Sequence, residues 1–466
     1  MRKTKIMSAT LCAVLLGAMT AFHAYCDTTA AAGQTIDMSS AIVTETGTSS
    51  VSLDDRSAAA VSSDTAGAAA VSSDTIGAAA VASDTTKTAA VSSGESESGT
   101  DAASSAAAGT ADVLDTTDLF SSRDLEQTAD LSEARAVTVT DGETVRITSA
   151  GVYVLSGAAS EAQILVEAGD EDKVQLVLDG VSITNTCTPC IYVKNADKVF
   201  VTTTDSENAL SVTGTFTADG TTNTDAVIFS RDDLVLNGTG TLQITSTDNG
   251  IAGKDDLKVT GGTLQITCTA DALEANDSIL IADGTISIST DKDGLHAEND
   301  EDNTTGYIYI CGGTLDITAG DDAIHATTIV RIDSSTIDLS AAEGIEGTYI
   351  QINDGAITIA ATDDAINAGQ KSDFATPTIE VNGGTVTVTM GAGDTDAIDS
   401  NGNIILNGGT LDITAQSPFD YDGTARNNGA TIIVNGTQTD TITNQMMGGG
   451  MGGRGGMGGM NGRRGW

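Results

Sequence analysis

Short segments in which apolar and polar residues alternate fill residues 136–445, and one of these segments recurs with nearly the same sequence. It reads Gly240-Thr-Leu-Gln-Ile-Thr245, and related segments begin at Gly262, Gly284, Gly313, Ser335, Gly355, Gly384 and Gly409. Successive side chains of a strand point to opposite faces, so each segment predicts a short strand with one buried face. Apolar and polar residues alternate in the same way in residues 136–235, although the sequence repeats less regularly there, and we interpret this region as the first copies of the same unit.

Each repeat contains two further apolar pieces after the first strand. The second piece reads Asp271-Ala-Leu-Glu-Ala275, Asp293-Gly-Leu-His-Ala297 and Asp322-Ala-Ile-His-Ala326, and the third is typified by Ser278-Ile-Leu-Ile281. Three short strands in about 22 residues form one coil of a parallel β-helix, which buries its apolar face only by stacking on its neighbours. Two longer units place loops at 298–306 and 370–377. We therefore predict an all-β protein built as a parallel β-helix.

Two other repeat architectures fit less well. A calcium-binding β-roll would show a period of about nine residues, and a β-sandwich would place two-residue Asn-Gly turns between antiparallel strands. Here Asn382-Gly383 and Asn407-Gly408 both precede the first strand of a unit. This constant phase favours the parallel coil.

The flanking segments lack the strand pattern. Residues 1–26 carry Arg2, Lys3 and Lys5 before an apolar run, as in a secretory signal peptide, and Cys26 leaves lipidation open as an alternative. Residues 27–111 are rich in Ala, Ser, Thr and Asp and predict a disordered stalk, and the Gly/Met-rich residues 446–466 predict a flexible tail. The domain is thus expected at 112–445, with a short helix within 112–134 capping its open end.

Composition narrows the range of partners. The 466 residues include 65 Asp+Glu and 21 Lys+Arg, a net charge of −44, and only 3% aromatics. Nucleic acids and anionic membranes need a basic surface, so neither is expected as a partner. No segment after the signal peptide is long and apolar enough to span a membrane. We expect a secreted, extracellular monomer, attached to the cell surface or free.

Four cysteines remain in the predicted domain. Cys187 and Cys190 can form a tight loop disulfide in an exported protein. A zinc site would need a second pair at similar spacing, and Cys268 and Cys311 are too far apart in the sequence to form one. We expect the cysteines to have a structural role or none.

Acidic residues recur at one corner of successive coils. Coils stack at about 4.8 Å, and like charges that close recruit a cation or raise one another's pKa. Ca²⁺ takes 6–8 oxygen ligands in flexible geometry and is the predicted cofactor. The alternative is that each Asp is a turn residue that caps backbone N–H groups. The candidate metal ligands are Asp271, Asp291, Asp293, Asp321, Asp322, Glu343, Asp363, Asp364, Asp394 and Asp396.

The middle residue of the second strand is expected to point outward in every coil. A polar stripe of this kind can face sugar hydroxyls or bind a metal, or it is simply a solvated ladder. Two histidines without a clear third ligand argue against zinc. The candidate ligand-binding residues are Glu274, His296, His325, Glu346, Asn367 and Asp399.

Several longer stretches resemble a known family. They are Arg123–Ala134, Asp172–Ile183, Ile191–Asp197, Phe229–Leu234 and Gly250–Leu257, together with the Asp-Gly-Leu-His-Ala repeats. The chain resembles the bacterial secreted carbohydrate-binding domain family with a pectate-lyase-like right-handed parallel β-helix. The resemblance implies a Ca²⁺-bearing binder of acidic pectic chains and cellulose, without an established catalytic role. The chain departs from the pattern where Glu343 and Asn249 replace the repeat Asp and where residues 420–430 lose the second-strand motif.

Three functions remain open from the residues themselves. A pectate lyase needs Ca²⁺ and an Arg or Lys base beside the uronate, but Lys254, Lys292 and Lys371 fall in different phases of the repeat. A glycoside hydrolase needs two carboxyl groups at a defined separation, which the many acidic residues do not exclude. A non-catalytic polysaccharide binder is the preferred interpretation, with a lyase or hydrolase and a structural adhesin as alternatives.

Overall fold

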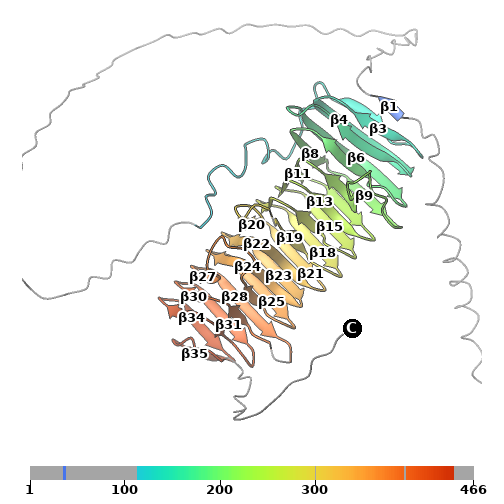
Figure 1. Ribbon diagram of the computed structural model, residues 1–466. Helices are drawn as coiled ribbons and strands as arrows, with labels where there is room; N and C mark the ends of the chain where they lie inside the picture. Colours follow the sequence, from blue (N-terminus) through green and yellow to red (C-terminus); the bar gives the residue numbers. More distant parts are fainter. Residues whose placement is uncertain (1–34, 38–112, 300, 393–394, 446–466) are drawn as a thin grey trace, which may run out of the picture. The chain divides into compact units, whose positions relative to one another are not determined.

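Parallel strands stacked along one direction make up most of the described part of the chain. A computed structural model describes residues 35–37, 113–299, 301–392 and 395–445, and these residues contain strands and turns but no helix (Figure 1). The predicted signal peptide, the C-terminal tail and all of the predicted stalk except Thr35–Asp37 lie outside the described residues. No described segment forms a helix that could cross a membrane.

The strands fall into three columns, in which each strand pairs in parallel with its counterpart in the neighbouring coil. The first column contains β4 (Gly151–Ser160), β6 (Lys173–Asn185), β9 (Glu207–Val212), β12 (Thr241–Thr245), β15 (Thr263–Cys268), β18 (Thr285–Thr290), β21 (Thr314–Thr318), β23 (Thr336–Ala341), β25 (Ala356–Ala361), β28 (Thr385–Met390), β31 (Thr410–Thr414) and β34 (Thr431–Val434). The second column contains β1 (Thr35–Asp37), β3 (Thr144–Ile147), β5 (Gln163–Glu167), β7 (Ile191–Asn195), β10 (Ala226–Ser230), β13 (Asn249–Gly253), β16 (Leu273–Ala275), β19 (Leu295–Ala297), β22 (Asp322–Ile332), β24 (Glu343–Ile352), β26 (Ile366–Ala368), β29 (Ile398–Ser400) and β32 (Asp420–Tyr421). The third column contains β2 (Arg135–Thr138), β8 (Lys198–Thr203), β11 (Asp233–Gly238), β14 (Asp256–Val259), β17 (Ser278–Ile281), β20 (Tyr307–Ile310), β27 (Thr378–Val381), β30 (Asn403–Leu406), β33 (Ala425–Asn427) and parts of β4, β6, β22 and β24.

This arrangement confirms an all-β, parallel, β-helix-like fold. The second column also continues to β32, because Asp399 pairs with Asp420 and Ser400 with Tyr421, even though residues 420–430 lack the repeat motif. At the C-terminal end, β35 (Thr437–Thr439) pairs antiparallel with β34.

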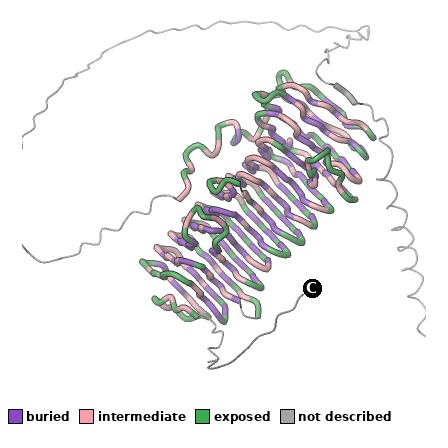
Figure 2. Tube along the Cα trace, viewed as in Figure 1, coloured by how far each residue is buried: buried purple, intermediate pink, exposed green. Residues whose placement is uncertain are grey.

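Aliphatic side chains form continuous stacks inside the coils. Leu242 of β12 pairs with Leu264 of β15, which pairs with Ile286 of β18, and all three are at most 4% exposed. Their neighbours in the strands point outward, which produces the alternation of buried and exposed positions in Figure 2. Apolar burial stabilises by about 25 cal/mol per Å², and no coil can obtain it without the next one.

An asparagine ladder explains the constant phase of the Asn-Gly pairs. The side-chain amide of Asn382 donates to Asn353 Oδ1, that of Asn407 donates to Asn382 Oδ1 and that of Asn428 donates to Asn407 Oδ1, each at 2.7 Å. Gly409 follows with φ of +78°, and a Cβ there would lie 2.6 Å from a backbone oxygen of the preceding coil. The turn therefore requires both the stacking amide and the glycine.

The predicted capping helix is wrong. Residues 113–134 form a series of turns, one of them closed by the N–H of Ser121 donating to Asp124 Oδ2 at 2.9 Å. Such local side-chain bonds compete with helix formation, and a short helix has little stability of its own in water. We refer to residues 113–134 as the strap.

The strap lies along the third column and does not cap the end of the stack (Figure 1). Arg331 Nη1 donates to the Leu114 carbonyl at 2.9 Å, and Lys258 Nζ donates to the Leu119 carbonyl at 2.7 Å. Further along, Gln127 Nε2 donates to the Thr260 carbonyl at 2.8 Å. The segment satisfies its backbone groups against the coils, which is why it does not need a helix to do so.

The cysteines that were candidates for a disulfide are free thiols in this structure. Cys187 is partly exposed, whereas Cys190 is buried, and burial raises the pKa of its thiol to about 12. Cys268 and Cys311 are also free. A buried thiol of this kind packs as a small apolar side chain.

The carboxylate of Asp124 is expected to hold the strap in place. It is fully buried, 3.3 Å from Lys198 Nζ and 4.0 Å from Lys258 Nζ. Removing one partner of a buried ion pair costs about 3–5 kcal/mol. We predict that Asp124→Ala lowers the thermal unfolding midpoint by several degrees, while Asp118→Ala at an exposed strap position does not. Equal midpoints for the two variants would contradict this role.

Candidate functional site

The repeat aspartates form a hydrogen-bonded ladder at the corner before the second column. Asp271, Asp293 and Asp322 are at most 7% exposed. The N–H of Asp293 donates to Asp271 Oδ1 at 3.2 Å, and the N–H of Asp322 donates to Asp293 Oδ1 at 2.9 Å. The ladder begins at Asn249, whose Oδ1 accepts from the N–H of Asp271 at 2.9 Å. One oxygen of Asp271 and one of Asp293 therefore cap the next coil, as the turn-residue alternative predicts.

The ladder changes where Glu343 replaces the repeat Asp. The longer Glu343 side chain accepts from Asn367 Nδ2 at 3.0 Å. The ladder resumes where the N–H of Asp396 donates to Asp364 Oδ1 at 2.9 Å. Burial raises the pKa of Glu343 to about 7 and that of Asp364 to about 6, and neighbouring carboxylates contribute to both shifts.

One set of predicted metal ligands converges. Asp293, Asp321 and Asp322 each place a carboxylate oxygen within 4.8 Å of the other two, and Asp321 is exposed. Ca²⁺ prefers such an all-oxygen set, so these residues fit the predicted ion. Asp291 and Asp363 are exposed and belong to no three-ligand set found in the described part of the chain, and Asp394 lies outside it.

The predicted polar stripe is in register through the second column, although it is less exposed than expected. Strand pairing aligns Glu274 with His296, His296 with His325 and His325 with Glu346, and the series continues through Asn367 to Asp399. Only 5% of Glu346 is exposed, because Lys371 Nζ lies 2.6 Å from its Oε1. The stripe is thus a half-buried, charged row.

The two histidines are held by carboxylates. His296 Nδ1 lies 2.9 Å from Asp271 Oδ2, and its Nε2 lies 3.4 Å from Glu298 Oε2. His325 Nδ1 lies 2.8 Å from Asp322 Oδ2. Burial alone would lower the pKa of His296, but the hydrogen bond and charge of Asp271 and the other nearby carboxylates outweigh burial and raise it to about 9.

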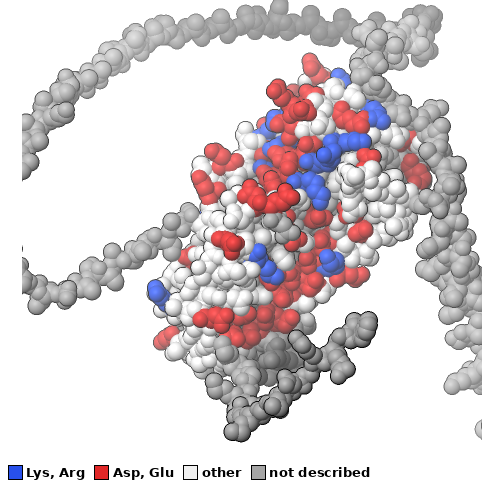
Figure 3. All heavy atoms as spheres, in the orientation of Figure 1, with Lys and Arg blue, Asp and Glu red and all other residues white. Residues whose placement is uncertain are grey.

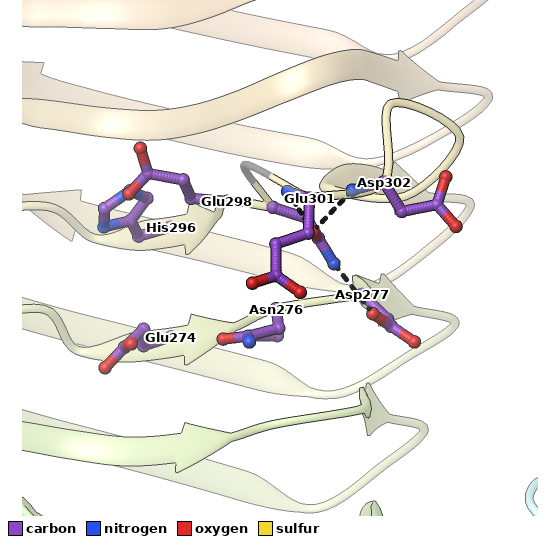
Figure 4. Close-up of a pocket in the computed structure, with 9 residues that line it drawn as sticks. Glu274, Asn276, Asp277, His296, Glu298, Glu301 and Asp302 are labelled. Carbon is purple, nitrogen blue, oxygen red and sulfur yellow. Dashed lines mark hydrogen bonds and ion pairs between the residues drawn. The ribbon is translucent and has the colours of Figure 1, made fainter. Parts of the chain in front are cut away.

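A cavity of about 620 Å³ opens beside the stripe (Figure 4). Its wall is polar and consists of Glu274, Asn276, Asp277, His296, Glu298, Asn299, Glu301 and Asp302 with Ala275. A second cavity of about 390 Å³ lies on the other side of the loop at 298–306 and shares Asn299, Glu301 and Asp302 with the first.

The sequence reasoning located this loop but missed its residues as part of a site. Asn299 organises the loop, because its Oδ1 accepts from the N–H groups of Glu301 and Asp302 at 3.0 and 2.9 Å, and its Nδ2 donates to Asp277 Oδ1 at 3.2 Å. The signal that could have found them is the extra length of this repeat unit, which places the loop next to the histidine stripe.

A family model described as "Carbohydrate-binding domain-containing protein" matches residues 141–391 and 340–448. The chain belongs to this family.

A curated protein and a solved structure are similar to parts of the chain. A "Carbohydrate-binding domain-containing protein" of Acetivibrio thermocellus is 41% identical over 124 residues, which is 25% of this chain and 43% of that protein. The chain therefore matches less than half the length of that relative. A solved structure, the polysaccharide lyase-like protein from C. thermocellum in a gadolinium derivative, is 33% identical, with a TM-score of 0.44 over 48% of this chain and 96% of that chain.

Acidic side chains cover much of the visible surface of the carbohydrate-binding domain, and the few basic side chains are interspersed (Figure 3). The basic residues near the stripe are paired: Lys254 Nζ lies 3.3 Å from Glu274 Oε1, and Lys292 Nζ lies 3.7 Å from Asp271 Oδ1. An anionic ligand approaching the stripe therefore meets repulsion unless a cation intervenes.

The buried carboxylates predict an unusual pH dependence of stability. Burial, with Asp364 and Asp420 nearby, raises the pKa of Asp399 to about 7. A raised folded-state pKa contributes stability that is present below the unfolded value and is lost as the pH rises through the folded value. The raised pKa of His296 acts in the same direction up to about pH 9. In chelator, the unfolding midpoint should fall as the pH rises from 5 to 9.

Asp399→Asn should raise the midpoint at pH 8 by about 2–4 °C and flatten this profile, because it removes a half-buried charge. Asp338→Asn, at an exposed position of β23, is the matched control. A midpoint that rises with pH would show that the buried carboxylates do not control stability.

Proposed function

We propose that this protein is a secreted or surface-attached, non-catalytic carbohydrate-binding protein that recognises acidic (pectic) or cellulosic polysaccharide with the assistance of Ca²⁺. The observation that carries the proposal is the pair of cavities lined by carboxylates and amides on either side of the loop at 298–306. They lie in the domain that belongs to the carbohydrate-binding family. In this proposal the strands form a right-handed parallel β-helix, the hand that parallel crossover connections almost always take.

The cavity walls suit sugar hydroxyl groups. Glu298, Glu301 and Asp302 offer carboxylate oxygens that accept from hydroxyls, and Asn276 and Asn299 offer amides that can donate or accept. No aromatic residue is among the residues that line either described cavity. Recognition by hydrogen bonds rather than by stacking on a ring therefore fits this surface.

Binding of an acidic polysaccharide to this acidic surface needs a bound cation. Asp293, Asp321 and Asp322 would hold Ca²⁺, and the ion supplies positive charge that a uronate carboxylate can share. The protein's own part is to orient two of these carboxylates: Asp293 Oδ1 accepts from the N–H of Asp322 at 2.9 Å, and Asp322 Oδ2 lies 2.8 Å from His325 Nδ1. The exposed Asp321 completes the set toward solvent.

The lysines argue against a lyase. Lys371 would have to be neutral to act as a base, but the hydrogen bond and charge of Glu346 outweigh burial and raise its pKa. The charge of Asp271 raises the pKa of Lys292 as well. Both groups stay protonated at neutral pH.

A hydrolase is the second candidate function, and two carboxyl groups favour it. The pKa values of Glu343 and Asp399 are raised to about 7, and carboxyl groups with raised pKa values are typical of general acids. Asp399 in β29 belongs to the polar stripe, and Glu343 in β24 accepts a hydrogen bond from the stripe residue Asn367. The same experiment tests both candidates.

The full chain should be incubated with polygalacturonate or with cellulose, with Ca²⁺ or with chelator, and assayed for co-sedimentation, unsaturated products and reducing ends. We predict sedimentation with polysaccharide and no new products. Asp321→Asn should weaken Ca²⁺-dependent binding by about tenfold, since it removes one of three carboxylates, at about 1.4 kcal/mol. Glu301→Gln should weaken binding with and without Ca²⁺.

Asp338→Asn on the first column serves as the matched control and should bind like the wild type. Product formation that is lost in Asp399→Asn or Glu343→Gln would establish the hydrolase instead. Absence of both binding and products with either polysaccharide would contradict both functions.

A further inference from the structure

We propose that His296 and His325, together with Asp293, bind one divalent transition-metal ion such as Zn²⁺. This site goes beyond the polysaccharide-binding function and does not depend on it. It shares Asp293 with the all-oxygen calcium set but differs from it in chemistry, because two of its three ligands are imidazoles.

The fold provides the third ligand that the sequence pattern lacked. His296 in β19 and His325 in β22 are paired in register, and their ring centroids are 4.9 Å apart. One potential ligand atom each from Asp293, His296 and His325 lies within 4.8 Å of the other two. Two imidazoles and one carboxylate are the protein ligands of many zinc sites.

Carboxylates already orient both rings. Asp271 Oδ2 lies 2.9 Å from His296 Nδ1, and Asp322 Oδ2 lies 2.8 Å from His325 Nδ1. Asp293 Oδ2 lies 3.5 Å from His296 Nδ1, the same ring nitrogen that Asp271 holds, so an ion bound by Asp293 and both rings takes the place of a ring proton. Carboxylates that surround the rings are the usual neighbours of metal-binding histidines. Imidazole nitrogen suits Zn²⁺, Cu²⁺ and Ni²⁺ rather than Ca²⁺.

A second observation at His296 points to a ligand. Its Nε2 is buried and makes no hydrogen bond, and Glu298 Oε2 lies 3.4 Å from it. A buried nitrogen without a hydrogen bond is costly to leave unsatisfied. Glu298 lines the larger cavity, where Figure 4 shows its side chain next to the His296 ring. The cavity gives an ion a route in, and Glu298 or water can supply a fourth ligand.

The neighbouring three-ligand set is a weaker choice. Asp322, His325 and Glu346 also place ligand atoms within 4.8 Å of one another. However, they share His325 with the first set, and Glu346 Oε1 already contacts Lys371 Nζ at 2.6 Å. One ion bound by both histidines therefore uses the better set of ligands.

The surrounding charges favour a divalent cation. Asp271, Asp293, Asp322 and Glu346 are all largely buried around the two rings, whereas the adjacent ammonium groups are those of Lys292 and Lys371. A bound dication would offset the excess of negative charge at low cost, because the carboxylates are already desolvated.

The test uses the full chain without a histidine tag, stripped of metal by chelator. Titration with Co²⁺ should reach saturation at one ion per chain and give visible absorption bands of mixed nitrogen and oxygen ligation, and Zn²⁺ should displace Co²⁺. His296→Gln and His325→Gln should each weaken Zn²⁺ binding by more than about 100-fold, and Asp271→Asn, which only orients His296, by about 10- to 100-fold.

Asp338→Asn, at an exposed position of β23, is the matched control, because it removes one carboxylate and leaves both histidines and the carboxylates around them in place, and its affinity for Zn²⁺ should equal that of the wild type. Thermal unfolding in chelator shows whether each variant is folded. A double variant, His296→Gln with His325→Gln, that binds Zn²⁺ like the wild type would overturn the site. So would displacement of Co²⁺ by an equal concentration of Ca²⁺.

A measurement on the wild type keeps the proposal testable if the variants fail to fold. The chain contains three histidines, and His23 is the other one. The imidazole NMR signals of His296 and His325 should shift together on addition of one equivalent of Zn²⁺, whereas unchanged signals would reject the site. Neither readout requires polysaccharide, so failure here is distinct from failure of the proposed function.

Discussion

In-register stacking of parallel strands is the constraint on which this structure depends. Neighbouring coils lie about 4.8 Å apart, so each side chain has the equivalent residue of the next coil as its nearest neighbour. For Leu242, Leu264 and Ile286 this contact is apolar and favourable, and each coil buries its apolar face against the next. The same geometry stacks Asn353, Asn382, Asn407 and Asn428 into a hydrogen-bonded row.

For acidic residues the same geometry creates a conflict. Asp271, Asp293 and Asp322 stack with like charges at short range, which is unfavourable in a buried position. The protein relieves the conflict with backbone N–H donors, with Lys292 and Lys371, and with the two histidines. Where these are insufficient, the carboxyl groups keep protons to a higher pH, as at Glu343 and Asp399. Bound cations are the remaining way to neutralise the row, and both proposed ions would lie there.

The loop at 298–306 and the strap make parts of the surface different from the otherwise repeated coils. The loop at 298–306 interrupts the repeat beside the histidines and separates two polar cavities. The strap covers part of the third column and accepts hydrogen bonds from Lys258 and Arg331, so these cations face the strap and not a ligand. The acidic second column and its loop are not covered by the strap, and the proposed sites lie there.

The sequence by itself determined the strands, their parallel order and the register of the polar stripe from Glu274 to Asp399. It could do so because each repeat carries the same alternation, and stacking in register follows from that period. It also named Asp293, Asp321 and Asp322 as neighbours. Only the tertiary structure decided that residues 113–134 are a strap and not a helix, because their partners, such as Lys198 and Arg331, are distant in sequence. Likewise, only folding brings Asp293 to both histidines and Glu298 to His296, since side-chain direction at a corner depends on which backbone groups the neighbouring coil leaves to be satisfied.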